Sequence, residues 1–555
     1  DALLTGLSKP VSRVVYLWAA EDLSFQTLDI EILNKQQRLG CQAALLLLQA
    51  LHKHLPETQV CLVTYHAIAV SVDEDLSGLA QAPLWGFAKS WALEHPELWD
   101  AIVDMPLTES VEYKAQVLLN ELLHRDNEDF IAYRNNQRYG LRLLRYQPEA
   151  NSTVEIKDDA SYLITGGLGA LGLNLALWLV EQGATHIILT ARNKASDRAN
   201  SIIALMQQNN IRVTVVNVDV ADDTGMSALF KTMSELNEPL RGIFHVAGIV
   251  NYDEIEGLAI DQLQAIMRPK VQGAWLLHQL SLDKPLDFFI SFSSIAALWG
   301  VKGQAHYAAA NQFLDALAHY RHHLGLPGLS INWGPWSEGG MATAQAQHFL
   351  QQQGIQSLVP KTQLSALSQL MSSSTVQAAV AKIDWSVLGE LFQLKRPRPL
   401  LSEIYCEWGQ KEKDVLLGKP VTDHWQNLTK EERKSVLLHY LQVQVTGILK
   451  IDVNDWPDLE QGFFSMGMDS LMAIELKNLL AAEFNAELPA TLIFDFPTLS
   501  KLASFLMNDV LQWSQQQTVE DLATGEGIED VETVEEIDKD IAERLKKLGN
   551  LLDNV

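Results

Sequence analysis

The chain has few cysteines, a shortage of basic residues and no long apolar run, and each shortage excludes a class of protein. Its 3 cysteines in 555 residues form neither a disulfide framework nor a zinc-binding spacing, which favours a reduced, cytoplasmic protein. Lysine and arginine number 42 against 69 acidic residues, and the net charge of −27 argues against nucleic acid and anionic membranes as partners. The longest apolar run, 43–48, falls far short of the roughly 20 residues that span a bilayer.

Strand-like and helix-like stretches alternate along most of the chain, whose length predicts three or four domains. In residues 1–150, short apolar segments at 14–18 and 60–64 indicate buried strands on either side of a helix at 41–51. No glycine-rich loop follows the first of these strands. We therefore expect residues 1–150 to form a Rossmann-like scaffold that holds no cofactor. Because the chain begins at Asp1 without a signal-like segment, we expect a fragment of a larger protein.

Residues 151–407 show the same alternation together with a cluster of glycines. A strand at 162–165 precedes the cluster, and further strand-like segments lie at 186–190, 213–218, 242–246, 288–292 and 328–333. Regular alternation of strands and helices predicts a parallel, doubly wound sheet. The expected fold class is α/β, with two Rossmann-like subdomains, one structural and one catalytic.

The remainder of the chain changes character. A polar linker at 408–428 leads to a helical segment at 429–512, which begins with a capping box from Thr429 to Glu432. We expect this segment to be a small all-α helical bundle. Residues 513–555 form a tether that we expect to be acidic and disordered, ending in a helix with one apolar face at 534–552.

A glycine-rich loop follows the strand at 162–165 and begins a helix. It consists of Thr165, Gly166, Gly167, Leu168, Gly169, Ala170, Leu171 and Gly172. Gly167, Gly169 and Gly172 fit the pattern G-x-G-x-x-G, in which glycines let the backbone approach a pyrophosphate at the helix N-terminus. The pattern alone is weak, but its position between a strand and a helix predicts a dinucleotide-binding site.

The ends of the later strands indicate which dinucleotide binds. NAD-dependent enzymes usually carry an acidic residue after the next strand, whereas this chain has Ala191 and Arg192 there. An arginine at this place can pair with a 2′-phosphate, which favours NADPH, although Arg192 could also be an ordinary surface residue. The next two strands end in residues expected to contact the adenine and the nicotinamide riboside: Asp219, Val220, Ala247 and Gly248. Each of these four, taken alone, could equally be structural.

Three polar residues fit a site that reduces a ketone, a reaction that needs a proton donor beside the carbonyl oxygen. Tyr307 is the natural donor, and Asn311 follows it by one helical turn on the same face. Ser294 ends a strand earlier in the chain. Because strand ends at the carboxyl edge of a parallel sheet line the ligand crevice, we expect Ser294 and Tyr307 to face the same cavity.

Together these motifs resemble the short-chain dehydrogenase/reductase superfamily, and within it the ketoreductase domains of modular type I polyketide synthases. In the general superfamily a lysine stands where this chain has Asn311. Polyketide ketoreductases have asparagine there and supply the lysine from an earlier helix, and Lys270 matches that lysine. The resemblance implies NADPH-dependent reduction of a β-ketoacyl thioester carried by an acyl carrier protein.

The resemblance also implies a role for each residue. Tyr307 would protonate the developing alkoxide, and Ser294 would hydrogen-bond the carbonyl oxygen. Lys270 would lower the pKa of the tyrosine and hold the cofactor ribose, and Asn311 would sustain a proton-relay water.

Other segments resemble further parts of these ketoreductases. The segments 82–88 and 94–99 resemble the structural subdomain. Pro335 and Trp336 resemble the turn beside the nicotinamide, and 337–354 would be the mobile substrate lid.

Family patterns also bear on stereochemistry. B-type ketoreductases carry a Leu-Asp-Asp motif where this chain has Val-Asn-Tyr at 250–252, and A-type domains carry a tryptophan in the place of Trp299. Gln304 stands where the subtype that acts with an epimerised α-carbon has histidine. The pattern resembles the A1 type and implies an L-configured hydroxyl, although Trp299 could simply pack in the wall.

In the helical segment, the run Gly-Met-Asp-Ser-Leu at 467–471 precedes a helix. A serine at a helix start is often merely an N-cap. This run and the Phe-Asp-Phe-Pro-Thr run at 494–498 resemble polyketide carrier proteins. The resemblance implies that Ser470 bears covalent 4′-phosphopantetheine, added by a phosphopantetheinyl transferase.

The resemblance implies further partners: upstream domains of the same synthase, a second copy of the chain in a homodimer, and a downstream synthase polypeptide bound by the helix at 534–552. That helix could instead pack on its own chain. Two alternatives remain for the whole molecule, namely a fatty acid synthase fragment and a non-catalytic carrier and docking module with a scaffold-only reductase. The sequence shows no metal-binding motif, and we predict no metal site.

Overall fold

The computed structural model describes residues 11–20, 28–124, 126–147, 154–235, 238–338, 344–393, 396–404, 430–449, 457–484 and 486–511. The predicted linker at 408–428 and the predicted tether and helix at 513–555 lie outside these residues. Within the described part of the chain, every helix is too short or too polar to cross a lipid bilayer.

The first α/β unit contains a five-stranded sheet in the order β1-β2-β3-β4-β5. Four neighbouring strands are parallel: β1 (Arg13–Tyr16), β2 (Gln59–Tyr65), β3 (Trp99–Met105) and β4 (Phe130–Arg134). The edge strand β5 (Gln137–Gly140) is antiparallel to β4. The helices are α2 (Ile30–Gln37), α3 (Ala43–His54), α4 (Pro83–Glu94) and α5 (Val111–Leu123). Strands β1 and β2 and helix α3 lie where the sequence predicted them.

The second unit contains a seven-stranded parallel sheet in the order β13-β11-β10-β9-β6-β7-β8. Its strands are β6 (Ser161–Thr165), β7 (His186–Ala191), β8 (Arg212–Asn217), β9 (Leu240–His245), β10 (Phe288–Ser294), β11 (Leu329–Trp333) and β13 (Gln377–Val380). The sequence analysis missed β13, a short edge strand. Two further short strands, β12 (Ile355–Gln356) and β14 (Lys382–Ile383), pair antiparallel and form a separate two-stranded sheet.

The helices of the second unit are α6 (Ala170–Glu181), α7 (Asp197–Gln208), α8 (Asp223–Ser234), α9 (Ile260–Leu280), α10 (Ala296–Trp299), α11 (Ala305–His323), α12 (Ala344–Gln352), α13 (Pro360–Met371) and α14 (Trp385–Gln393). The strand order reverses between β6 and β9, so the crevice at their carboxyl ends is the topological switch point, where such sheets bind ligands.

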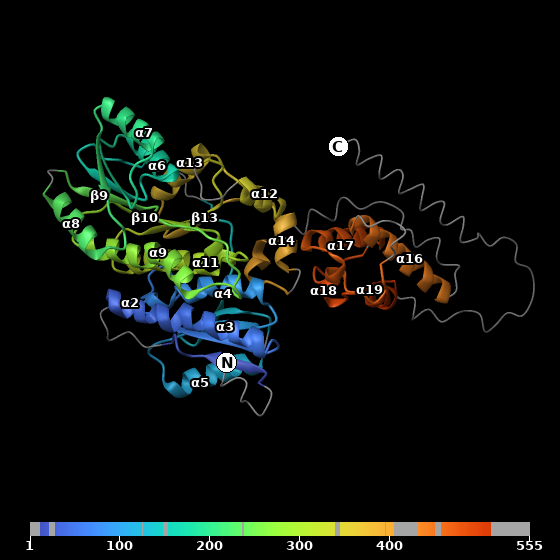
Figure 1. Ribbon diagram of the computed structural model, residues 1–555. Coiled ribbons are helices and arrows are strands. Elements are labelled where there is room, and N and C mark those ends of the chain that lie inside the picture. The colour runs from blue at the N-terminus through green and yellow to red at the C-terminus, as the bar shows by residue number, and fades with distance from the viewer. Residues whose placement is uncertain are drawn as a thin grey trace, which may run out of the picture.

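The two units share one hydrophobic core. Helices α9 and α11 of the second unit and α4 of the first lie between the two sheets (Figure 1). A single cluster of buried apolar side chains joins residues such as Trp85 and Phe87 on α4 to Phe313 and Leu314 on α11. Gly86 allows the closest approach, because a Cβ there would lie 2.2 Å from the carbonyl oxygen of Ala308.

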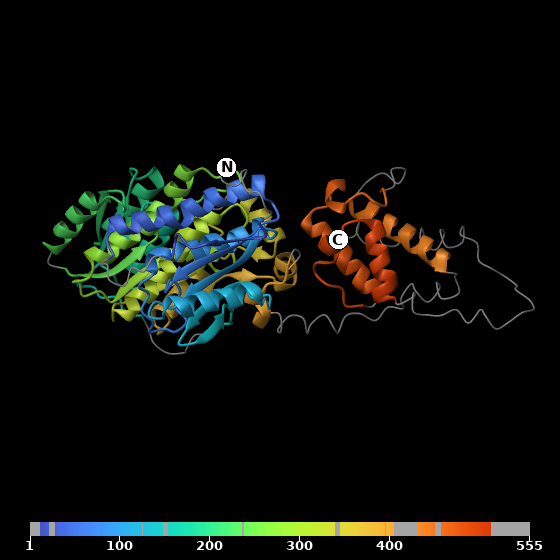
Figure 2. The ribbon, with the colours of Figure 1, turned by 90° about the horizontal axis from the view of Figure 1, so that it is seen from below.

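The remaining helices form a bundle with a core of its own (Figure 1, Figure 2). They are α16 (Lys430–Leu449), α17 (Ser470–Phe484), α18 (Leu492–Asp495) and α19 (Leu499–Phe505). Leu441, Leu476 and Leu502 are fully buried in this core. The predicted fold class, two Rossmann-like α/β units followed by a small all-α bundle, is confirmed.

The approach of α4 to α11 predicts the effect of a single methyl group. Gly86→Ala should force the two helices apart and destabilise the protein by about 1–3 kcal/mol, the usual cost of overpacking a core. The midpoint of thermal unfolding measures the loss. Gly257→Ala is the control, since its added carbon meets no atom closer than 4.0 Å. Equal melting temperatures for Gly86→Ala and the wild type would contradict this packing.

Candidate active site

A cavity of about 500 Å³ lies at the carboxyl ends of the strands of the second sheet. Its walls come from the segments that follow β6, β7, β8 and β9 and from the ends of β10 and β11. A volume of this size is typical of a pocket that encloses a cofactor or a small ligand.

The glycine-rich loop after β6 is packed so tightly that some of its glycines have no space for a side chain. Gly166 has a φ of +68°, and a Cβ there would lie 2.9 Å from the Cα of Ala247. A Cβ on Gly172 would lie 2.6 Å from both Gly166 O and Gly167 Cα. Gly169 caps α6 and lines the cavity, so the helix N-terminus faces the space. This arrangement fits the pyrophosphate of a dinucleotide.

The structure brings most of the predicted cofactor-binding residues to this cavity. The ones that line it are Gly166, Leu168, Gly169, Leu171, Gly172, Ala191, Arg192, Asp219, Val220, Ala247 and Gly248. Thr165 and Gly167 do not line it. Thr165 Oγ1 lies 2.8 Å from His245 Nδ1 and joins β6 to β9 beneath the loop. Gly167 packs against Leu189, which leaves no room for a Cβ.

Positive charge gathers at the end of the cavity beyond β7. Arg192 is exposed and lines the cavity, and so does Lys194, which the sequence analysis did not single out. Asp219 forms an ion pair of 2.6 Å with Arg268. Partial burial alone would raise the pKa of Asp219, but hydrogen bonds from Ala221 N–H and Arg268 outweigh burial and lower it. Asp219 therefore stays anionic and holds the backbone N–H of Ala221 at this wall of the cavity.

Tyr307, Ser294 and Lys270 line the same cavity. Burial raises the pKa of Tyr307 to about 12, although hydrogen bonding with Asn311 and Ser294 opposes the rise. Lys270 Nζ donates a hydrogen bond of 2.8 Å to Phe292 O and lies 6.0 Å from the centroid of the Tyr307 ring. Burial lowers the pKa of Lys270 to about 7. The three predicted groups therefore converge from α11, β10 and α9.

Asn311 lies behind Tyr307 and does not line the cavity. Its Nδ2 donates to Tyr307 O at 2.8 Å, and its own carbonyl accepts from Ser293 Oγ at 3.2 Å. Its side-chain oxygen is buried and accepts no hydrogen bond from the described residues. These contacts hold Asn311 one turn below Tyr307, with an acceptor available for a water molecule.

Helix α4 of the first unit holds the backbone of two segments that carry cavity-lining residues. Glu94 accepts hydrogen bonds from Ile255 N–H at 2.8 Å and Gly303 N–H at 2.9 Å. Ser90 Oγ accepts from Val301 N–H at 3.1 Å. These residues were not among the predicted site residues, because hydrogen bonds across more than 150 positions leave no local pattern in a sequence. The first unit thus contributes to the site although it does not line the cavity.

The residues predicted to control stereochemistry separate into two groups. Gln304, Pro335 and Trp336 line the cavity. Gln304 hydrogen-bonds with Tyr252, a cavity residue that the sequence analysis did not assign to the site.

Trp299 is not among the cavity-lining residues. It is 3% exposed and packs edge-on against Trp385, with ring centroids 5.9 Å apart. Its cluster includes Ile355 and Leu350, which do line the cavity, so Trp299 acts as a support for that wall. Leu350 belongs to α12, in the segment predicted as a lid, whose residues 339–343 lie outside the described part.

Ser470 is exposed at the start of α17. Asp469 Oδ1 accepts a hydrogen bond of 2.8 Å from Met472 N–H and thus caps the helix. The alternative reading of Ser470 as an N-cap is therefore wrong. Gly467, with a φ of +97°, turns the chain into the helix and presents Ser470 to solvent.

Three family models match the chain. A KR domain matches residues 160–338, a phosphopantetheine attachment site matches 439–506, and the Rossmann fold domain of the polyketide synthase extender module SpnB matches 2–143. A solved A1-type ketoreductase is 34% identical, with a TM-score of 0.64 over 71% of this chain and 82% of that one. The chain belongs to the ketoreductase family of modular type I polyketide synthases.

The curated relatives that the chain matches are much longer proteins. The pikromycin synthase component PikAIII of Streptomyces venezuelae is 32% identical over 80% of this chain, which spans 29% of PikAIII. EryA3 of Saccharopolyspora erythraea, an erythronolide synthase, is 32% identical over 82% of this chain, which spans 14% of EryA3. The first ketoreductase of the tylosin synthase superimposes with a TM-score of 0.63 at 31% identity over 73% of this chain and 84% of that one.

These matches establish a ketoreductase domain, which is an oxidoreductase, joined to a carrier domain with a phosphopantetheine attachment site. They favour a polyketide synthase over the fatty acid synthase alternative.

The buried Lys270 should cost the ketoreductase stability. We expect Lys270→Met to increase the free energy of unfolding at neutral pH by about 1–4 kcal/mol, and so to raise the melting temperature, because it removes a buried charge and keeps the volume. The folded protein releases the lysine proton near pH 7, whereas the unfolded chain keeps it up to about 10.5. Wild-type stability should therefore gain from rising pH across this window, and the variant should lose that part of the slope.

Thermal unfolding followed as a function of pH tests this expectation. Lys302→Met, whose side chain is 66% exposed, is the matched control and should change neither the melting temperature nor the slope. A Lys270→Met variant less stable than the wild type at neutral pH would show that burial of this lysine is not unfavourable.

Proposed function

We propose that this ketoreductase uses NADPH to reduce a β-ketoacyl thioester, carried on the phosphopantetheine of Ser470, to an L-configured β-hydroxyacyl thioester. The observation that carries the proposal is the convergence of Tyr307, Ser294 and Lys270 on the cavity that the glycine-rich loop also lines. A scaffold-only reductase would have no use for a buried lysine beside a buried tyrosine.

The nicotinamide cofactor, when bound, supplies the hydride. The substrate carbonyl oxygen would lie between the hydroxyls of Ser294 and Tyr307, both of which donate hydrogen bonds to it. As the carbonyl carbon is reduced, Tyr307 transfers its proton to the oxygen and becomes a tyrosinate. A protonated Lys270 stabilises that anion electrostatically, since its ammonium lies near the ring. Asn311, with its buried acceptor oxygen, would hold the water that returns a proton.

The preference for NADPH is supported by charge. Arg192 and Lys194 follow β7 at the cavity wall, where the 2′-phosphate of the adenosine would lie. No acidic residue stands between them, since the segment is Arg-Asn-Lys. An arginine can hold a phosphate through two parallel hydrogen bonds, which a ribose hydroxyl does not offer.

The A-type assignment is supported by residues around the substrate side of the cavity. Tyr252 stands where the B-type motif would place an acid, and its hydrogen bond to Gln304 closes one wall. Trp299 supports another part of the cavity wall through Ile355 and Leu350.

The proposal includes further partners. The exposed position of Ser470 suits both a phosphopantetheinyl transferase and delivery of the acyl chain to the cavity. We also propose upstream domains of the same polypeptide, a homodimeric synthase, and a downstream polypeptide bound through the segment 534–552. This segment lies outside the described residues.

Tyr307→Phe tests the chemistry. We expect at least a hundredfold loss of NADPH oxidation with a β-ketoacyl thioester, because no other proton donor takes the place of the hydroxyl. Chiral analysis of the wild-type product should show the L-hydroxyl. Tyr320→Phe, on the same helix but outside the cavity, is the control and should retain activity. Wild-type protein that fails to oxidise NADPH would favour the non-catalytic carrier module.

Arg192→Ala tests the cofactor preference. Loss of the charge-assisted contact should raise KM for NADPH by about 10- to 100-fold and leave KM for NADH unchanged. Arg198→Ala, an exposed arginine on α7, should change neither value. An equal effect of Arg192→Ala on both cofactors would remove the proposed phosphate contact.

A further inference from the structure

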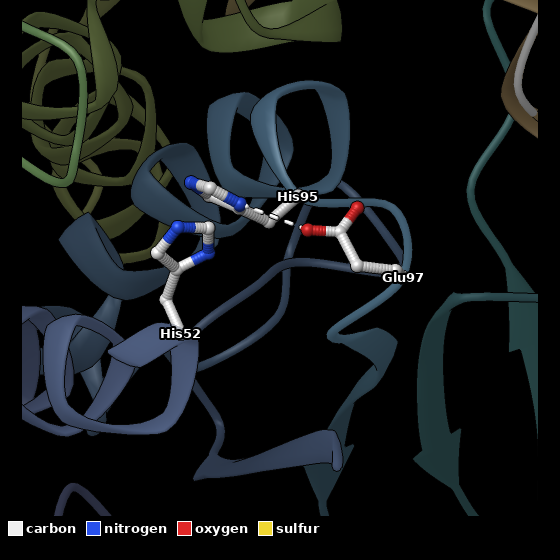
Figure 3. Close-up of side chains that lie close together, drawn as sticks. All are labelled: His52, His95 and Glu97. Carbon is white, nitrogen blue, oxygen red and sulfur yellow. Dashed lines mark hydrogen bonds and ion pairs between the residues drawn. The ribbon is translucent and has the colours of Figure 1, made fainter. Parts of the chain in front are cut away.

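Two histidines and a glutamate converge on the surface of the first unit, away from the cavity. His52 lies in the last turn of α3, His95 follows α4 as its C-cap, and Glu97 lies two residues further on. The three side chains point toward one another (Figure 3). Each offers one ligand atom, and the three atoms all lie within 4.8 Å of one another. None of the three lines the cavity.

The spacing of these atoms is close to that of a tetrahedral metal site. His95 Nδ1 lies 3.0 Å from Glu97 Oε1, and the rings of His52 and His95 have centroids 4.8 Å apart. Two ligand atoms bound to zinc at 2.0–2.1 Å in tetrahedral geometry are about 3.3 Å apart. Small rotations of His52 and Glu97, whose side chains are 44% and 49% exposed, would therefore suffice to close the site.

The second nitrogen of His95 supports the same interpretation. His95 is 4% exposed, and its Nε2 makes no hydrogen bond with the described residues although Glu256 Oε1 lies 3.2 Å away. A metal-bound histidine usually directs its other ring N–H to a carboxylate, which orients the ring. Glu256 occupies that place. Glu94 also lies nearby, but both of its oxygens already accept backbone N–H groups.

We propose that His52, His95 Nδ1 and Glu97 bind a divalent transition-metal ion, Zn²⁺ by the chemistry of the ligands, with Glu256 as the outer carboxylate. Two imidazoles and a carboxylate are a donor set that zinc favours, and the exposed side leaves the fourth position to water. The sequence offers no such motif, because 42 residues separate His52 from His95.

The ion would stabilise a wall of the cavity. Glu256 belongs to the segment that follows β9, and the neighbouring Ile255 is held by Glu94 through its N–H and by Gln49 through its carbonyl at 2.8 Å. The same segment carries Tyr252, which lines the cavity. A metal that orders His95 also orders Glu256, and thereby strengthens the contact between the first unit and this segment. The role is structural, since the ligands lie outside the cavity.

Metal binding by the full chain tests the proposal. The protein is prepared without a histidine tag and without phosphopantetheine, so that neither a tag nor the thiol binds metal, and it is titrated calorimetrically with Zn²⁺. We expect one ion per chain. His52→Ala and Glu97→Gln should each weaken binding at least tenfold, and Glu256→Gln by about 10- to 100-fold. Because His52 and Glu97 are partly exposed, these variants should fold normally, as circular dichroism checks.

Two further results decide the outcome. Co²⁺ bound in place of Zn²⁺ should show the intense visible absorption of a tetrahedral site, which His52→Ala abolishes. The double variant His322→Ala/His323→Ala, which removes an adjacent surface pair outside the cluster, is the control and should bind Zn²⁺ as the wild type does. Equal affinity in the wild type and His52→Ala, or loss of binding in the control, would overturn the proposal. Activity is not the readout, so failure here leaves the proposed reductase unaffected.

Discussion

Helix α11 carries Tyr307 and Asn311, and every residue from Ala305 to Ala318 is buried. A helix that is buried on all sides needs small residues and close neighbours, and alanines occupy six of these fourteen positions. Helix α4 approaches α11 most closely at Gly86, where a side chain would not fit. A helix fixed in this way cannot rotate or slide without breaking contacts with both units. The orientation of Tyr307 is therefore a property of the core that the two units share.

Burial also explains the unusual ionisation of the groups around the site. Asp315 lies two turns below Tyr307, and burial raises its pKa although it accepts hydrogen bonds from Ser330 Oγ at 2.6 Å and Asn332 Nδ2 at 2.9 Å. Asn332 in turn donates to Ser293 Oγ, which donates to the Asn311 carbonyl. This chain of polar groups joins α11 to β10 and β11. Buried polar groups in a low-dielectric environment need hydrogen-bond partners, and this chain of groups provides them.

Local motifs in the sequence predicted the parts of the site that depend on local structure. The glycine-rich loop needs Gly166 at a positive φ and Gly172 without a Cβ, and such requirements leave a readable pattern. Tyr307 and Asn311 are one turn apart on one helix, so their spacing also predicted that they share a face. Lys270 came from family resemblance, because nothing in its own neighbourhood indicates that its Nζ reaches Phe292 O.

Contacts between distant parts of the chain could not be predicted in this way. Trp299 illustrates the limit: the family pattern linked it to stereochemical control, but only the structure shows that it lies behind the cavity-lining residues, packed against Trp385. Glu94 illustrates the opposite case, an acidic residue in an apolar segment whose two oxygens hold Ile255 and Gly303. Neither the neighbours of Glu94 nor its spacing points to partners in the other unit.

The first unit therefore contributes to the active site although it lacks a phosphate-binding loop. Ser90 and Glu94 on α4 hold the backbone at Val301, Gly303 and Ile255, in two segments that carry cavity-lining residues. A single Rossmann unit would leave these segments exposed to water, which competes for the same backbone N–H groups. By covering them, the first unit fixes the cavity walls while the second binds the reactants. Loss of the first unit should consequently disturb the geometry of the cavity walls before it impairs cofactor binding, because the atoms nearest to the glycines of the loop all belong to the second unit.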